Sequence, residues 1–240
     1  MDFIGGIMEN RPIGVIDSGI GGLNVLKKLT IDFKNESFIY LGDNGNAPYG
    51  NKSKDYLFKR LKLLLECLNE KNVKCVVVAC NTLSTTFKWF LEEYKVPTVL
   101  TIPKYEREGD YLLCTPLTAK SKCVKDNFND SVLPLPMLAG EIERHLFEPE
   151  KIMIHKDLKG VPSSAKRLVL GCTHYLYLEE KIKEVSRLET ENGLTYISNE
   201  LKSVLTKNCL ENTSGKQSLT FLGDHKNYNE KVYYKALKGF

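Results

Sequence analysis

Two cysteines in closely matched surroundings are the first candidates for chemistry in this chain. Cys80 follows an apolar run and one small residue, and Cys172 does the same about ninety residues later. Such a run is typical of a buried parallel strand, and α/β folds bind ligands at the carboxyl ends of these strands. Free cysteine is often buried, so each thiol alone could be a core side chain. The repeated context favours a site with one thiol on each side of a substrate.

The residues after each cysteine suit proton transfer. Asn81, Thr82 and Thr173 are residue types that begin helices, and a helix start increases the thiolate fraction of a nearby cysteine. His174 lies two positions after Cys172, where an imidazole could accept or donate a proton. The pattern therefore predicts a proton acceptor on one face of a substrate and a donor on the other.

Two other kinds of site are weaker alternatives. A glycine-rich loop follows Asp17 and Ser18, but a dinucleotide-binding loop would need glycine where this chain has Asn24. We interpret Asp17 and Ser18 instead as a carboxylate and a hydroxyl at a strand end. A Cys-His hydrolase would need only one cysteine and would leave Cys80 unexplained.

A second loop, residues 43–50, could also reach a ligand. It contains Pro48, Tyr49 and Gly50, a combination typical of a tight turn. The loop could present the Tyr49 hydroxyl and backbone N–H groups to a ligand, or it could simply join a strand to a helix.

Short apolar runs alternate with amphipathic stretches along the chain, as in α/β folds with a parallel sheet. The predicted strands are 13–16, 38–41, 75–79, 98–102, 111–114, 167–171, 194–198 and 219–222. Helices are predicted over 54–70, 175–188, 199–210 and 227–238. Three further helices are expected directly after Gly22, Thr82 and Glu141. Only residues 103–110 separate two of these strands, which is too short for a parallel crossover with its helix. This connection is therefore either a hairpin or one that lacks the usual helix.

Composition excludes several functional classes. The chain has 240 residues and a net charge of +4, with no basic block, so we expect no nucleic-acid partner. Seven cysteines, an odd number without Cys-x-x-Cys spacing, indicate a reducing compartment and no structural zinc site. The start, residues 1–10, is too brief for an export signal, and no apolar run is long enough to span a bilayer. We therefore predict a cytoplasmic protein that binds no metal and no membrane.

Four motifs in order resemble the glutamate racemase family: residues 13–23, 43–50, 79–82 and 170–175. Weaker similarities are Thr115, Thr118 and Ser121, the acidic Glu141, and a closing segment at 221–237. The resemblance covers about residues 11–238.

The resemblance implies an α/β fold with two pseudo-symmetric lobes, each a mostly parallel sheet flanked by helices, and a site in the cleft between them. The first lobe would comprise 1–101, completed by 199–240, and the second, reduced lobe would comprise 102–198. The implied activity is cofactor-independent racemisation of a small amino-acid substrate, glutamate, which supplies D-glutamate for peptidoglycan synthesis. A homodimer is also expected.

The same resemblance implies roles for individual residues. Cys80 and Cys172 would be the acid/base pair, assisted by Asp17 and His174 respectively. In the family the first-lobe thiol serves the D-enantiomer and the second-lobe thiol serves the L-enantiomer. The substrate would be held by Asp17 and His174 together with Ser18, Tyr49, Gly50, Asn81, Thr82, Glu141 and Thr173.

The chain also departs from the family pattern. The second lobe is short, Leu176 stands where the family commonly has proline, and Asn44 replaces a common threonine. These departures leave two alternatives open: a non-catalytic racemase-like binding protein, or a racemase for aspartate or another amino acid. His174 favours the glutamate type.

Overall fold

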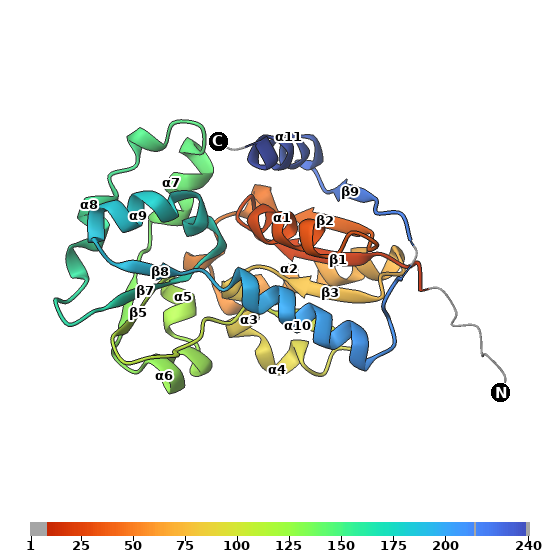
Figure 1. Ribbon diagram of the computed structural model, residues 1–240, viewed down its shortest axis with the longest axis horizontal. Coiled ribbons are helices and arrows are strands. Elements are labelled where there is room, and N and C mark those ends of the chain that lie inside the picture. The colour runs from red at the N-terminus through yellow and green to blue at the C-terminus, as the bar shows by residue number, and fades with distance from the viewer. Residues whose placement is uncertain (1–8, 214, 239–240) are drawn as a thin grey trace.

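The computed structural model describes residues 9–213 and 215–238, so most of the segment 1–10 lies outside the described residues. The chain forms two parallel sheets, each with helices around it (Figure 1). The first is five-stranded, in the order β4-β3-β1-β2-β9. Its strands are β1 (Ile13–Asp17), β2 (Phe38–Gly42), β3 (Cys75–Val78), β4 (Thr98–Leu100) and β9 (Leu219–Leu222). We call this sheet and its helices the first lobe.

The second sheet is four-stranded, in the order β6-β5-β7-β8, and is also parallel throughout. Its strands are β5 (Asp110–Cys114), β6 (Val132–Pro134), β7 (Arg167–Gly171) and β8 (Glu189–Glu191). We call this sheet and its helices the second lobe. The predicted fold class, two parallel α/β lobes with the second smaller, is confirmed.

Helices cover both faces of the first sheet. The helix α1 (Gly22–Asp32) packs against α10 (Leu194–Lys207) and α11 (Lys226–Lys238) on one face. The other face carries α2 (Lys54–Glu70), α3 (Asn81–Thr86) and α4 (Lys88–Leu91). Figure 1 shows α11 next to α1, and α10 also contacts β4, so the end of the chain completes the lobe that its start begins.

The first lobe's α2 illustrates how sequence spacing sets this packing. Ser53 caps the helix by accepting a hydrogen bond from the Tyr56 N–H. Its leucines recur at helical spacing, and the stripe they form is buried against the sheet: Leu57, Leu61, Leu64, Leu65 and Leu68.

Shorter helices surround the second sheet. They are α5 (Pro116–Ala119), α6 (Lys122–Phe128), α7 (Leu138–His145), α8 (Ile154–Asp157) and α9 (Glu179–Ser186).

Short 3-10 turns occur in both lobes. They are η1 (Asn44–Asn46), η2 (Tyr49–Asn51), η3 (Pro149–Lys151), η4 (Leu158–Gly160) and η5 (Thr173–Leu178). The helix expected after Glu141 thus begins earlier, at Leu138, and the first turns of the expected helix 175–188 are 3-10.

The short connection before β5 joins the two sheets. β4 and β5 belong to different sheets, so the hairpin alternative is wrong and the usual helix is absent. The connection has no helix, and the buried carboxylate of Asp110 holds it in position instead. The Asp110 carboxylate accepts the N–H groups of Glu106 and Arg107 and pairs with Arg167 at 2.6 Å.

The predicted strand 194–198 is wrong, because these residues begin α10. Ile197, Leu201 and Leu205 are buried at helical spacing and face the first lobe, which outweighs the local preference of β-branched and aromatic residues for strands. The predicted boundary at 198/199 falls inside this helix. The division into 1–101 with 199–240, and 102–198, stays a prediction.

Within the described part of the chain, no helix is both long and apolar enough to cross a membrane.

Candidate active site

The two cysteines line one small cavity between the lobes. Cys80 follows β3 and Cys172 follows β7, so each thiol lies at the carboxyl end of a parallel strand. Both are buried, with exposed fractions of 5% and 7%. The cavity is lined by Ser18, Pro48, Tyr49, Gly50, Cys80, Asn81, Thr82, Thr115, Ala139, Cys172, Thr173 and His174. Its free volume is about 10 Å³, room for roughly one water molecule, so the lobes are closed on each other.

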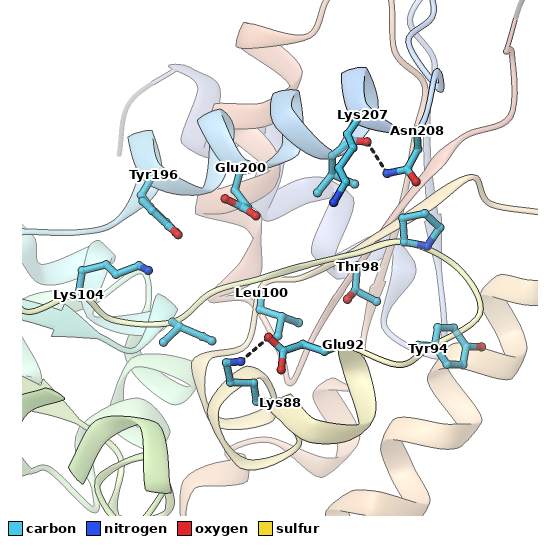
Figure 2. Close-up of a pocket in the computed structure, with 13 residues that line it drawn as sticks. Lys88, Glu92, Tyr94, Thr98, Leu100, Lys104, Tyr196, Glu200, Lys207 and Asn208 are labelled. Carbon is cyan, nitrogen blue, oxygen red and sulfur yellow. Dashed lines mark hydrogen bonds and ion pairs between the residues drawn. The ribbon is translucent and has the colours of Figure 1, made fainter. Parts of the chain in front are cut away.

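A much larger groove, of about 520 Å³, lies elsewhere, between α10 and α4 along β4. Figure 2 shows Lys104 and Tyr196 at one end of this groove and Tyr94 at the other. None of the described residues that line this groove is a cysteine. Chemistry rather than size therefore identifies the candidate site as the cavity with the two thiols.

Cys80 is surrounded by uncharged side chains and one carboxylate, that of Asp17. Asp17, at the end of β1, is fully buried and accepts hydrogen bonds from the Gly19 N–H at 3.0 Å and from Thr173 Oγ1 at 3.2 Å. Burial raises the pKa of Asp17, although the His174 charge opposes the shift. Burial and the Asp17 charge also raise the pKa of Cys80, so this thiol holds its proton at neutral pH.

The surroundings of Cys172 contain an imidazole. His174 Nδ1 lies 3.7 Å from Cys172 Sγ, and His174 Nε2 lies 2.7 Å from Glu143 Oε1. Burial opposes protonation of His174, but the hydrogen bonds to Cys172 and Glu143 outweigh it and raise the pKa of His174 well above its ordinary value. This side of the cavity therefore carries a cation beside the sulfur.

The glycine-rich loop after β1 packs against the other lobe. A Cβ at Gly21 would lie 2.4 Å from Thr173 Oγ1 and 2.8 Å from the His174 backbone N. A Cβ at Gly19 would overlap the Glu143 carboxylate. The glycines therefore permit close approach between the lobes.

Hydroxyl groups from both lobes meet at the cavity. Thr82 Oγ1 lies 2.9 Å from Thr115 Oγ1, which donates to Thr118 Oγ1 at 3.0 Å. Ser121, which the sequence grouped with Thr115 and Thr118 as a weak similarity to the family, donates a hydrogen bond to the Thr118 carbonyl. It does not line the cavity. Gly50 approaches Thr115 so closely that a Cβ there would lie 2.4 Å from the Thr115 Cβ. None of the described residues that line the cavity is Lys or Arg.

Tyr49 lines the cavity, but its hydroxyl has another partner. It donates to Asp43, whose carboxylate also accepts two hydrogen bonds from Arg60 at 2.9 and 2.7 Å. The expectation that this hydroxyl is presented to a ligand is therefore not met by the structure. The ring and backbone of the loop remain available to form the wall.

The acidic residue at the second thiol is Glu143 and not Glu141. Glu141 does not line the cavity, and its charge acts on Asp157 instead. Two positions along α7 correspond to a rotation of roughly 200°, which places the two carboxylates on different faces of the helix. Sequence reasoning named Glu141, placed the helix after it, and missed Glu143. The signal that could have found it is the direction of the buried face of the helix, which lies nearer to Glu143 than to Glu141 at about 100° per residue. The buried residues of that face are Leu138, Ala139, Gly140 and Ile142.

The remaining predicted residues lie together. Ser18, Asn81, Thr82 and Thr173 all line the cavity and are nearly fully buried. In residues 9–213 and 215–238, no three His, Cys, Asp or Glu side chains are placed to hold a metal ion. The arrangement can carry out proton transfer from two sides of a small molecule, with neutral donors around it.

Comparison with known proteins gives a consistent result. No family model matches the chain. Glutamate racemase of Clostridium botulinum (strain Alaska E43 / Type E3) is 35% identical over 241 residues, which cover 90% of this chain and 93% of the relative. Glutamate racemase of Clostridium kluyveri is 32% identical, covering 96% and 98%. The crystal structure of Thermus thermophilus glutamate racemase in complex with β-chloro-D-alanine has a TM-score of 0.83 at 26% identity, covering 95% of each chain. That of Francisella tularensis glutamate racemase in complex with D-glutamate has a TM-score of 0.77 at 25% identity, also covering 95% of each chain.

Proposed function

Because the chain belongs to the glutamate racemase family, we propose that it interconverts L- and D-glutamate, with Cys80 and Cys172 as the two acid/base residues. The observation that carries the proposal is that both buried thiols line one cavity, each from a different lobe. Racemisation without a cofactor must remove the Cα proton from one face and add a proton to the other. Two fixed groups on opposite sides meet this requirement.

In the L-to-D direction, the Cys172 thiolate takes the Cα proton and the Cys80 thiol donates its proton to the opposite face. Cys172 then holds a proton and Cys80 is the thiolate, so the D-to-L reaction runs with the roles reversed. Each positioned transfer contributes about 10²–10⁴-fold to the rate.

The charges around the thiols support this starting state. The raised pKa of Cys80 keeps its proton available, and a protonated His174 stabilises negative charge on the nearby Cys172 sulfur. Asp17 accompanies the first thiol and the His174–Glu143 pair accompanies the second.

We assign substrate binding to the hydroxyl, amide and backbone groups of the cavity wall, from Ser18, Gly50, Asn81, Thr82, Thr115 and Thr173, with Tyr49 in the wall. The relative from Francisella tularensis has been solved with D-glutamate, which supports an amino acid of this kind as the ligand. Because the closed cavity holds about one water molecule, glutamate enters only when the lobes move apart.

The biological role follows from this activity. The product D-glutamate would supply peptidoglycan synthesis. Both thiols must stay reduced to act, and all seven cysteines are free, so we place the protein in the cytoplasm. Catalysis would need no cofactor, because thiols alone supply the acid and the base. A homodimer stays a prediction, which sedimentation of the purified protein would test.

The test is Cα hydrogen exchange in D₂O, followed together with circular dichroism for each glutamate enantiomer. We expect exchange and racemisation in the wild type, and a loss of at least about 10³-fold in both Cys80→Ala and Cys172→Ala. Cys67→Ala, on α2 and away from the cavity, is the matched control and keeps wild-type rates. Glutamate binding without exchange in the wild type would indicate the non-catalytic alternative. Faster exchange of aspartate than of glutamate would indicate the other substrate.

A further inference from the structure

One peptide group of the glycine-rich loop makes hydrogen bonds to both lobes. The Gly19 carbonyl accepts a hydrogen bond of 2.5 Å from the Tyr40 hydroxyl, and Tyr40 lies on β2 of the first lobe. The N–H of the same peptide group, which belongs to Ile20, donates to Glu143 Oε1 at 2.9 Å in the second lobe. This peptide group therefore links a buried tyrosine to a carboxylate of the other lobe.

The chain of hydrogen bonds continues to the second thiol. The oxygen that accepts the Ile20 N–H, Glu143 Oε1, is the one that lies 2.7 Å from His174 Nε2. His174 Nδ1 then lies 3.7 Å from Cys172 Sγ. A continuous path thus runs from Tyr40 through the peptide group, Glu143 and His174 to Cys172.

Burial makes this path effective. Tyr40 is fully buried and His174 is 2% exposed, so water does not compete for these hydrogen bonds. In such surroundings successive hydrogen bonds polarise one another. The Tyr40 hydroxyl also occupies a restricted space, because a Cβ at Gly22 would lie 2.9 Å from it.

We propose that Tyr40 is a positioning residue for the second thiol, acting through the peptide group between Gly19 and Ile20 on the Glu143–His174 pair. This inference rests on the proposed racemase function. Tyr40 fixes and polarises the peptide group, whose N–H fixes the Glu143 carboxylate against His174. No proton moves through the peptide, and the tyrosine touches neither sulfur nor substrate.

The test uses Tyr40→Phe, which removes the hydroxyl and keeps the ring. We expect kcat/KM to fall about 3- to 10-fold in both directions, since the equilibrium constant is unchanged. The diagnostic measurement is the primary isotope effect on kcat/KM with each α-deuterated enantiomer. Because the step at Cys172 becomes slower relative to the step at Cys80, the isotope effect rises for L-glutamate and falls for D-glutamate.

Two control variants separate this role from general damage. Tyr233→Phe removes a buried hydroxyl that pairs with Thr30 at 2.7 Å in the same lobe, and it leaves both isotope effects unchanged. Tyr177→Phe removes a hydroxyl that donates to the Ile20 carbonyl at 2.8 Å, which belongs to the next peptide group. It lowers the rate in both directions but leaves the ratio of the two isotope effects at its wild-type value.

The outcomes are distinct. A shifted ratio of isotope effects in Tyr40→Phe alone supports the proposal. An unchanged ratio in a folded Tyr40→Phe variant overturns it, and so does an equal shift in Tyr177→Phe, because the loop would then act only by its placement. If the wild type shows no Cα exchange, the proposed function itself fails.

Discussion

The two thiols occupy corresponding places in the two lobes, but their neighbours differ in charge. Two positions after Cys80 the chain has Thr82, whose hydroxyl joins other threonines, whereas two positions after Cys172 it has His174, held by Glu143. One thiol therefore lies among neutral groups and a buried carboxylate, and the other lies beside a cation. The difference teaches that two similar backbones can give two thiols different electrostatic surroundings.

The largest effect should come from removing the cation. His174→Gln keeps a polar side chain but cannot be protonated, so charge on Cys172 loses its partner. We expect kcat/KM to fall about 10³-fold in both directions, with the isotope effect rising for α-deuterated L-glutamate. Initial rates with both enantiomers measure this, and His155→Gln, on α8, is the control. A loss of less than about threefold would contradict the assigned role.

Gly21→Ala should hold the two lobes, and with them the two thiols, apart. The new Cβ would overlap Thr173 and the His174 backbone, so the lobes could not close fully. We expect a loss of about 10²-fold in kcat/KM, the scale of a 1 Å misplacement in an active site. Gly45→Ala is the control, since the nearest atom to its Cβ lies 3.9 Å away. Equal activity of the two variants would show that this contact does not matter.

Asp17→Asn should produce the mirror image of the histidine variant. Asp17 accompanies Cys80, so we expect the isotope effect to rise for D-glutamate and fall for L-glutamate, with kcat/KM lowered about 10-fold in both directions. Separate measurements with each α-deuterated enantiomer are needed because equilibrium requires equal losses of kcat/KM. A shift of the same sign as in His174→Gln would disprove the pairing of Asp17 with Cys80.

The same variant should also be more stable than the wild type. The pKa of Asp17 is raised mainly by burial, so the ionised carboxylate destabilises the fold. This penalty is absent below the ordinary pKa of aspartate and grows as the pH rises through the raised value. Thermal unfolding should therefore show a gain in Tm of about 2–4 °C for each kcal/mol recovered, larger at pH 8 than at pH 5. A gain that shrinks with rising pH would have the wrong sign.

Sequence was sufficient for the parts of the molecule governed by local patterns. The helical spacing of the leucines in α2, and the apolar runs that precede Cys80 and Cys172, can be recognised in the sequence alone. The start of α10 could not be predicted so simply. Its first residues, Leu194 to Ser198, also suit a strand, and only packing on α1 and β4 decides for a helix.

In the candidate site, too, some residues could be predicted from the local sequence and others only from the folded structure. Cys80, Cys172, Asp17 and His174 are recognisable by type and context. Glu143 was missed because choosing between two acids on one helix requires knowing which face turns toward the cleft. The Tyr49 hydroxyl was expected at the ligand because its partners, Asp43 and Arg60, come together only in the folded protein.

The most direct test of two opposed thiols is the position of deuterium after brief reaction in D₂O. Starting from either unlabelled enantiomer, we expect deuterium at Cα of the product, delivered by the thiol on the far face, and almost none in the recovered substrate. Equal labelling of substrate and product at early times would mean that one group serves both faces, which would contradict the account.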